Sequence, residues 1–152
     1  MIWKWLILIT TIACASCTIV PNSHYNQVRT TAYTHNERDH YKYGRSNAIG
    51  KTLQAGNVNS AACDWSFLPV GTKFRIRGDS TLYVIDDYGS ALVGTRTIDI
   101  YRPSRQSMNN WGTRVVDIDV VCMGSYQQSI DILTQRQNYR HTRKMLTTLT
   151  NR

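Results

Sequence analysis

Short strand-like segments separated by turn signals fill most of this 152-residue chain and restrict the folds open to it. Residues 73–77 and 114–122 alternate polar and apolar side chains, as a strand with one buried face does. Residues 82–85 form a continuous apolar run that suits a strand buried on both faces, and Gly78-Asp79 precedes it as a turn signal. Several short strands with turns between them indicate a β-barrel or a β-sandwich. A chain of this length has enough residues for one domain with a sizeable core.

The amino terminus has the pattern of a secretory signal peptide, which we assign to residues 1–16. A single Lys is followed by an apolar run too short to span a bilayer comfortably, and then by small residues. The run ends in Cys14-Ala15-Ser16-Cys17, which resembles a bacterial lipobox, so Cys17 is the expected lipidation site and residues 17–26 the lipidated linker. A second possible lipobox, Thr11-Ile12-Ala13-Cys14, ends at Cys14, and simple secretion is a further alternative. We therefore expect a lipoprotein of the bacterial cell envelope, in the periplasm and anchored to the outer membrane.

Two further cysteines remain if Cys17 carries a lipid. An exported protein meets an oxidising compartment, in which disulfide bonds persist. We predict a disulfide between Cys63 and Cys122, which would join the loop around residue 64 to the last predicted strand. Two buried thiols are the alternative.

The chain is basic, with a net charge of +8, and much of the excess lies after Gly124. Residues 126–149 contain no Pro or Gly, so we predict that residues 125–152 form a basic tail with one or two helices. The tail either packs on the barrel, which we favour, or lies on an anionic membrane surface. For an exported chain, envelope polyanions are a better match than nucleic acid, so we expect no nucleic-acid partner.

The spacing of histidine and cysteine matches no metal site, and no phosphate-binding loop is present, so no metal or organic cofactor is expected. The four histidines are expected on the solvated surface, and they are His24, His35, His40 and His141.

Three aspartates stand beside strand-like segments and are candidate catalytic residues. Asp87 precedes a glycine turn, Asp99 is flanked by Ile98 and Ile100, and Asp64 comes shortly before Leu68. A carboxylate among apolar side chains is partly desolvated, which raises its pKa and lets it act as a proton donor near neutral pH. Taken singly, each Asp also fits a structural role in a turn.

These acids belong to an ordered set of motifs between Thr31 and Val121. The motifs are Thr31-Ala32-Tyr33-Thr34, Asn47-Ala48-Ile49-Gly50-Lys51, Asp64-Trp65-Ser66-Phe67-Leu68-Pro69-Val70-Gly71-Thr72, Asp87-Tyr88-Gly89-Ser90-Ala91-Leu92-Val93-Gly94 with Ile98-Asp99-Ile100-Tyr101, and Asn110-Trp111-Gly112 with Arg114-Val115-Val116. The set resembles the 3D domain, named for its three aspartates and shared by the membrane-bound lytic transglycosylase A family and small cell-wall enzymes. This chain differs from the pattern by Ser90 in place of Gly, Val93 in place of Lys and an additional Thr97.

The resemblance implies a mostly β fold, a double-psi β-barrel over residues 27–124. It also implies a lytic transglycosylase that cleaves the MurNAc–GlcNAc bond of peptidoglycan glycan strands and releases 1,6-anhydro products. Asp99 would be the acid/base residue, and Asp87 and Asp64 would tune its pKa, orient it or bind the sugar. No cofactor is implied.

Four further residues are the expected substrate-binding residues: Lys51, Tyr33, Tyr43 and Gly89. Tyrosine rings stack on sugar rings, and Lys51 is suited to bind the glycan or to reduce repulsion among the acids. Two other functions fit the sequence. One is a non-catalytic peptidoglycan-binding envelope lipoprotein, and the other is a structural lipoprotein that docks a protein partner through the basic tail.

Overall fold

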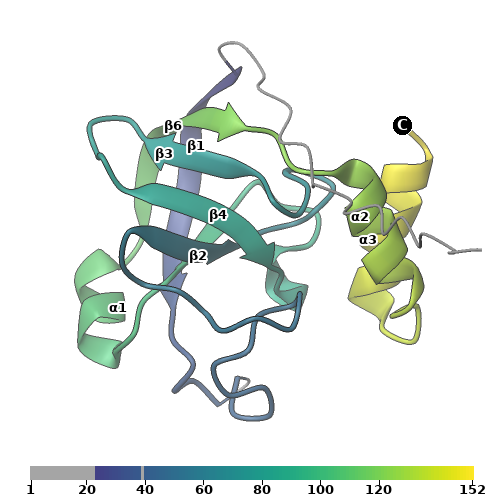
Figure 1. Cartoon of the computed structure of the whole chain (residues 1–152), viewed down its shortest axis with the longest axis horizontal. Coiled ribbons are helices and arrows are strands. Elements are labelled where there is room, and N and C mark those ends of the chain that lie inside the picture. Colours follow the sequence, from purple (N-terminus) through teal and green to yellow (C-terminus); the bar gives the residue numbers. More distant parts are fainter. Residues whose placement is uncertain (1–22, 39) are drawn as a thin grey trace, which may run out of the picture.

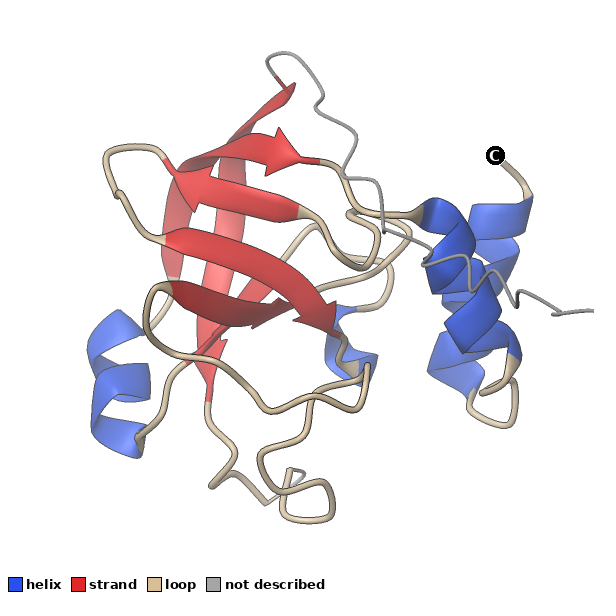
Figure 2. Cartoon of the chain, viewed as in Figure 1, coloured by secondary structure: helices blue, strands red, loops and turns tan. Residues whose placement is uncertain are grey.

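Six strands close into a β-barrel in the computed structural model, which describes residues 23–38 and 40–152 (Figure 1). The strands are β1 (Ser23–Tyr33), β2 (Val58–Ala62), β3 (Lys73–Ile76), β4 (Leu82–Asp87), β5 (Ile98–Tyr101) and β6 (Arg114–Cys122). Their order around the barrel is β1-β5-β2-β4-β3-β6. The pairs β1–β5 and β2–β4 are parallel and the others antiparallel. A mostly β barrel with a helical carboxyl terminus is therefore confirmed (Figure 2).

The predicted signal peptide, the lipidation site Cys17 and most of the predicted linker lie outside the described residues. Strand β1 begins at Ser23, inside the range predicted as linker. Its first residues pair with β6, from Ser23 opposite Val120 to Tyr25 opposite Ile118. The barrel therefore starts four residues earlier than residue 27.

The barrel interior is apolar and continuous with residues from the loops between strands. Trp65, which precedes β3, is fully buried, and its indole nitrogen donates a hydrogen bond of 2.9 Å to the carbonyl of Asp87. A second, smaller cluster contains Tyr33, Leu53, Ala62, Leu92 and Tyr101. Because side chains alternate along a strand, Ala62 and its interior neighbour Ala61 point to opposite faces of the sheet.

Two short helices interrupt the barrel. The 3₁₀ helix η1 (Ser90–Leu92) lies between β4 and β5. Helix α1 (Arg105–Trp111), which we did not predict, precedes β6 and is capped by Ser104, whose hydroxyl accepts a hydrogen bond from the Ser107 amide.

The carboxyl-terminal tail forms α2 (Tyr126–Thr134) and α3 (Arg140–Thr150), which pack against one end of the barrel (Figure 1). Leu133, Met145 and Leu149 are buried in the same apolar core as the barrel residues. The backbone of Val70 is joined to the tail, because its amide donates to the Ser129 hydroxyl and its carbonyl accepts from Ser125, both at 3.0 Å. The tail is therefore part of the domain, as the favoured alternative predicted.

None of the helices in residues 23–38 and 40–152 is long and apolar enough to cross a membrane.

The predicted disulfide between Cys63 and Cys122 is wrong, because Cys63 is a free, fully buried thiol while Cys122 is disulfide-bonded. The Cys63 sulfur lies in the turn that follows β2, 3.3 Å from the carbonyl of Asp64 and 3.4 Å from that of Leu68. Cys122 ends β6, where it pairs with Lys73. Burial raises the pKa of the Cys63 thiol, so this thiol is unreactive in the folded protein.

Candidate active site

A row of four residues crosses four adjacent strands of the barrel. Thr31 on β1 pairs with Asp99 on β5, Asp99 pairs with Ala62 on β2, and Ala62 pairs with Asp87 on β4. Residues directly opposite one another on neighbouring strands point to the same face of a sheet. The two acids therefore lie on either side of Ala62, with backbones two strand spacings, or about 9–10 Å, apart. Ala62 lines the same cleft as the two acids.

A β-bulge at Asp86 brings Asp87 into this row. Ile85 pairs with Ala61 and Asp87 pairs with Ala62, so Asp86 is an extra residue on β4. Without this bulge, Asp86 would oppose Ala62. Bulges re-aim side chains near active sites, and here the bulge selects which of two successive acids faces the row.

Asp99 has the properties of a proton donor. Burial raises its pKa to about 6, and the negative charges of Glu37 and Asp87 act in the same direction. The Thr31 hydroxyl opposes this shift, because it donates a hydrogen bond of 2.7 Å to the Asp99 carboxylate. The additional Thr97 is accommodated before β5, since Thr31 and Asp99 remain direct partners. A carboxyl group with this pKa is partly protonated near neutral pH, as general acid catalysis requires.

Asp87 is held in a fixed orientation by several donors. One oxygen accepts hydrogen bonds from the backbone amides of Ala48 at 3.0 Å and Tyr88 at 2.9 Å. The other accepts a hydrogen bond of 2.9 Å from the Tyr33 hydroxyl and lies 3.7 Å from Nε2 of His40. Burial and the charge of Asp87 raise the pKa of Tyr33 well above its usual value, so the phenol keeps the proton that it donates. This arrangement suits an orienting group.

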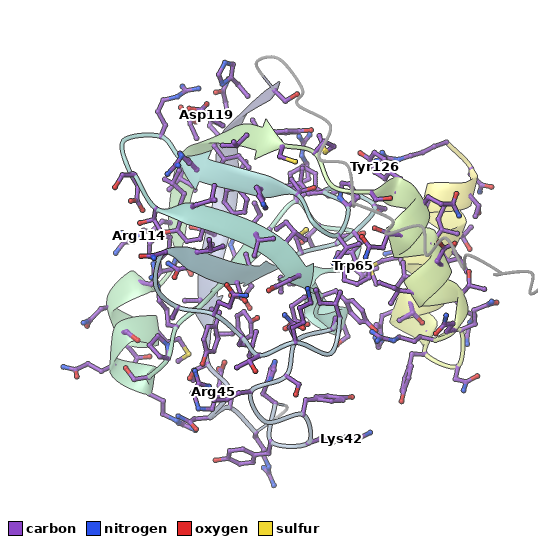
Figure 3. All side chains as sticks on the ribbon, viewed as in Figure 1. Lys42, Arg45, Trp65, Arg114, Asp119 and Tyr126 are labelled. Atoms are coloured by element: carbon purple, nitrogen blue, oxygen red, sulfur yellow. The ribbon has the colours of Figure 1, made fainter. Side chains whose placement is uncertain are left out.

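A cleft of about 290 Å³ lies over the row. Glu37 and His40, from the loop after β1, line it together with residues 88–92, which follow β4. Lys42 and Arg45 mark the loop after β1 at the lower edge of the molecule in Figure 3. The cleft therefore lies between two loops, and its floor carries both acids.

Tyr88, in the cleft wall next to Asp87, is held in place by the core and by the tail. Its ring packs edge-on against Trp65 with centroids 4.9 Å apart. Its hydroxyl accepts a hydrogen bond of 3.1 Å from the guanidinium of Arg136, which follows α2. The carboxyl-terminal tail thus supports one wall of the cleft.

Asp64, the third predicted catalytic acid, does not line this cleft. One of its oxygens accepts hydrogen bonds from the amide and hydroxyl of Ser66, at 2.8 and 2.6 Å, and the other accepts one of 2.6 Å from the Gly94 amide. Asp64 is only 3% exposed. It stabilises its own turn and joins that turn to the loop before β5, which is the structural role that an Asp in a turn commonly has.

The four predicted substrate-binding residues divide into two groups. Tyr33 and Gly89 line the cleft, although the Tyr33 hydroxyl already donates to Asp87. Lys51 is exposed in a turn and does not line the cleft. Tyr43 is 54% exposed, and its ring contacts His40 edge-on with centroids 6.2 Å apart. Tyr33 therefore helps to hold Asp87 in place, and Gly89 forms part of the cleft wall.

Sequence reasoning missed Glu37 and His40. We expected His40 on the solvated surface, but its side chain is only 17% exposed and its ring packs on Tyr33 with centroids 5.4 Å apart. The loop that carries both residues has no regular apolar period, so no local signal placed them beside the acids. The Thr-Ala-Tyr-Thr motif did include Thr31 and Tyr33, without indicating their partners.

Asp86 is a second unusual acid, buried beneath the loop that contains Asn47. One of its oxygens accepts hydrogen bonds from Asn47 at 2.9 Å and from the Ser60 hydroxyl at 2.7 Å. The other oxygen is buried without a partner among the described residues. Burial raises the pKa of Asp86 to about 6. Asp86 does not line the cleft, so we assign it a structural role.

Within residues 23–38 and 40–152, no three His, Cys, Asp or Glu side chains gather as metal ligands would. The comparison with curated proteins gives no match. Residues 59–123 match the family model of the 3D domain, a range that contains Asp64, Asp87 and Asp99. Thr31, Tyr33 and the loop after β1 precede this range and complete the cleft. Residues 59–123 therefore belong to the 3D domain family, which is associated with peptidoglycan-related barrel domains.

Proposed function

We propose that this protein is a lytic transglycosylase that cleaves the MurNAc–GlcNAc bond of peptidoglycan glycan strands. The observation that carries the proposal is Asp99, a carboxyl group with a pKa raised to about 6 at the floor of a cleft. Most glycosidases need two carboxylates, because one must act as a nucleophile or activate water. In the lytic reaction the C6 hydroxyl of the cleaved MurNAc is the nucleophile, so one acid/base residue suffices.

The reaction begins with protonated Asp99. The carboxyl group donates its proton to the glycosidic oxygen, and the bond between that oxygen and C1 of MurNAc breaks. The C6 oxygen of the same ring then bonds to C1, and its proton passes to the Asp99 carboxylate. The products are a 1,6-anhydro sugar and a free GlcNAc hydroxyl, and Asp99 regains the proton with which it began.

Asp87 is the orienting residue in this proposal. Its carboxylate is fixed by two backbone amides and the Tyr33 hydroxyl, so it remains in place when a sugar enters. It lies across Ala62 from Asp99, in the row that a glycan in the cleft would contact. A preoriented acceptor there binds a sugar hydroxyl without the cost of ordering a mobile side chain.

The proposal requires the protein to reach the cell wall. Export through the predicted signal peptide supplies that location, and it stays a prediction.

Mature protein incubated with purified sacculi tests the proposal, with 1,6-anhydro products measured by mass spectrometry. Asp99→Asn keeps the shape of the side chain and should lower the cleavage rate by about 100-fold or more, the usual value of general acid/base catalysis. Asp87→Asn should cost less, and Asp131→Asn, an exposed change in the tail, should cost nothing.

Two results would contradict the proposal. If the wild-type protein binds sacculi but yields no anhydro sugar at any pH, it is a peptidoglycan-binding lipoprotein instead. If Asp99→Asn retains the wild-type rate while Asp87→Asn does not, the acid is Asp87.

A further inference from the structure

A second cleft, of about 450 Å³, lies where the loop before β5 meets the tail. Its walls hold three aromatic rings and two guanidinium groups, contributed by Tyr25, Phe67, Tyr126, Arg96 and Arg152. Tyr126 begins α2 and is labelled at that position in Figure 3. The lining of this cleft includes Asp64 and none of the other catalytic or substrate-binding residues predicted from the sequence, and it has no residue in common with the lining of the first cleft.

Both arginines are positioned by aromatic rings. The Arg96 guanidinium lies 5.0 Å from the ring centre of Phe67 and 5.8 Å from that of Tyr25. Arg152 lies 4.6 Å from the ring centre of Tyr126 and donates a hydrogen bond to the carbonyl of Ser66. Neither pairs with a carboxylate among the described residues. A guanidinium stacked on a ring keeps its N–H groups at the edge available for an anion.

The charge of this cleft is positive. Asp64 is the one acidic side chain among the described residues that line it, and both Asp64 oxygens accept hydrogen bonds, one from Ser66 and the other from the Gly94 amide. The ammonium group of Lys144 lies over Gly94, in the space that a side chain at that position would need. Two guanidinium groups therefore line the cleft and Lys144 lies close to its Gly94, so an anionic group that enters the cleft is attracted to it.

One short segment links the two clefts. Residues 88–92 line the cleft of Asp87 and Asp99, and residues 94–96 line the second cleft. The hydrogen bond from the Gly94 amide to Asp64 fixes the segment between them. A molecule bound in the second cleft therefore contacts the same loop that borders the acids.

We propose that the second cleft binds the carboxylate groups of peptides attached to the glycan strand, an inference that rests on the proposed function. Peptidoglycan carries such peptides, so a strand seated at Asp99 brings carboxylates with it. The planar fork of Arg96 matches a carboxylate with two parallel hydrogen bonds, and the aromatic walls contact the apolar part of a peptide.

Equilibrium binding on the non-cleaving Asp99→Asn protein tests this inference. The probes are glycan fragments that carry their peptides and the same fragments after an amidase has removed them. Peptide-bearing fragments should bind more tightly than fragments without peptides. Adding Arg96→Gln should lower the affinity for the peptide-bearing fragments by about five- to tenfold and abolish the difference in affinity between the two kinds of fragment. Arg96→Lys keeps the charge but loses the two parallel hydrogen-bond donors. Its affinity for the peptide-bearing fragments should lie between that of the protein with Arg96 and that of Arg96→Gln. Arg75→Gln is the matched control, because Arg75 is exposed on β3 and its substitution removes the same positive charge.

Equal affinity for both fragments, or equal effects of Arg96→Gln and Arg75→Gln, would overturn the inference. Binding of the isolated peptide tests this inference separately from the proposed function. If that binding depends on Arg96, the second cleft is a peptide site even if wild-type protein releases no anhydro sugar. Arg96-dependent binding to phosphatidylglycerol vesicles, without binding to the peptide, would assign the cleft to lipid phosphate and overturn the inference.

Discussion

Thr31 and Asp99 are direct partners on the parallel strands β1 and β5, and the Thr31 hydroxyl donates a hydrogen bond of 2.7 Å to the Asp99 carboxylate. This contact stabilises the ionised form of a carboxyl group whose burial favours the neutral form. The pKa of Asp99, about 6, therefore reflects the burial and nearby carboxylates that raise it and the Thr31 hydrogen bond that lowers it. Thr31, on the neighbouring strand β1, thus lowers the pKa of the proposed acid Asp99.

Thr31→Val should raise the pKa of Asp99, because it removes the hydrogen bond that stabilises the carboxylate. Since the protonated form is the donor, activity should then persist to higher pH, and the alkaline limb of the kcat/KM profile should move up by about 0.5–1 pH unit. Thr31→Ser keeps a hydroxyl and should leave the limb in place. A profile unchanged in Thr31→Val would show that another group sets this limb.

Asp86→Asn should make the protein more stable at neutral pH. Burial raises the pKa of Asp86 to about 6, so the stability that its proton provides is present below pH 4 and is lost as pH rises through 6. Between pH 4 and pH 8 that loss is about 2–3 kcal/mol. Asn keeps an acceptor for Asn47 and Ser60 and carries no charge.

Urea unfolding from pH 4 to pH 8 measures this effect as the difference between Asp86→Asn and wild type, which should grow with pH in favour of the variant. Asp131→Asn, at an exposed position, is the control. A difference that stays constant over this range would mean that Asp86 titrates normally.

Gly124→Ala should disrupt the junction between the barrel and the tail. A methyl group at Gly124 would lie 2.1 Å from the carbonyl oxygen of Val70 and 2.4 Å from the amide of Thr72, and backbone atoms do not yield as a flexible side chain does. We expect a loss of at least about 2 kcal/mol, seen as a lower Tm. Gly56→Ala is the matched control, because a methyl group there meets open space. Equal Tm values for the two variants would contradict this packing.

Thiol labelling without reductant should distinguish the two described cysteines. Folded protein should leave Cys63 unlabelled because its thiol is buried. In denaturant, Cys63 should react and Cys122 should not, since Cys122 is disulfide-bonded. Peptide mapping by mass spectrometry reads both sites. Protection of both in denaturant would restore the bond predicted from the sequence, and labelling of both would mean that Cys122 is reduced.

The local part of the fold could be predicted from the sequence. Alternation in residues 114–122 and the apolar run in residues 82–85 indicated β6 and β4 within a residue or two. Strand β2 was not predicted, because Val58-Asn59-Ser60-Ala61-Ala62 is small and polar and has no clear strand pattern. Helix α1 has no buried residue and so no apolar period to detect.

Two acids of the candidate site could be predicted from the sequence, but the residues around them could not. Asp87 and Asp99 were identified from their apolar and glycine-rich neighbours, and both line the cleft. Their alignment through Ala62 depends on pairing between strands that are distant in the sequence and on the bulge at Asp86, and no local pattern encodes either. Asp64 was predicted with them but does not line the cleft, and its carboxylate is bound by Ser66 and the Gly94 amide.

The row from Thr31 to Asp87 also determines when the candidate site forms during folding. Its members come from β1, β5, β2 and β4, and none of the neighbouring pairs in the row joins strands that follow one another along the chain. Contacts between distant segments form late, because loop closure must come first. A nascent or partly folded chain therefore contains every acid but no cleft, and the candidate site is assembled only when the barrel closes.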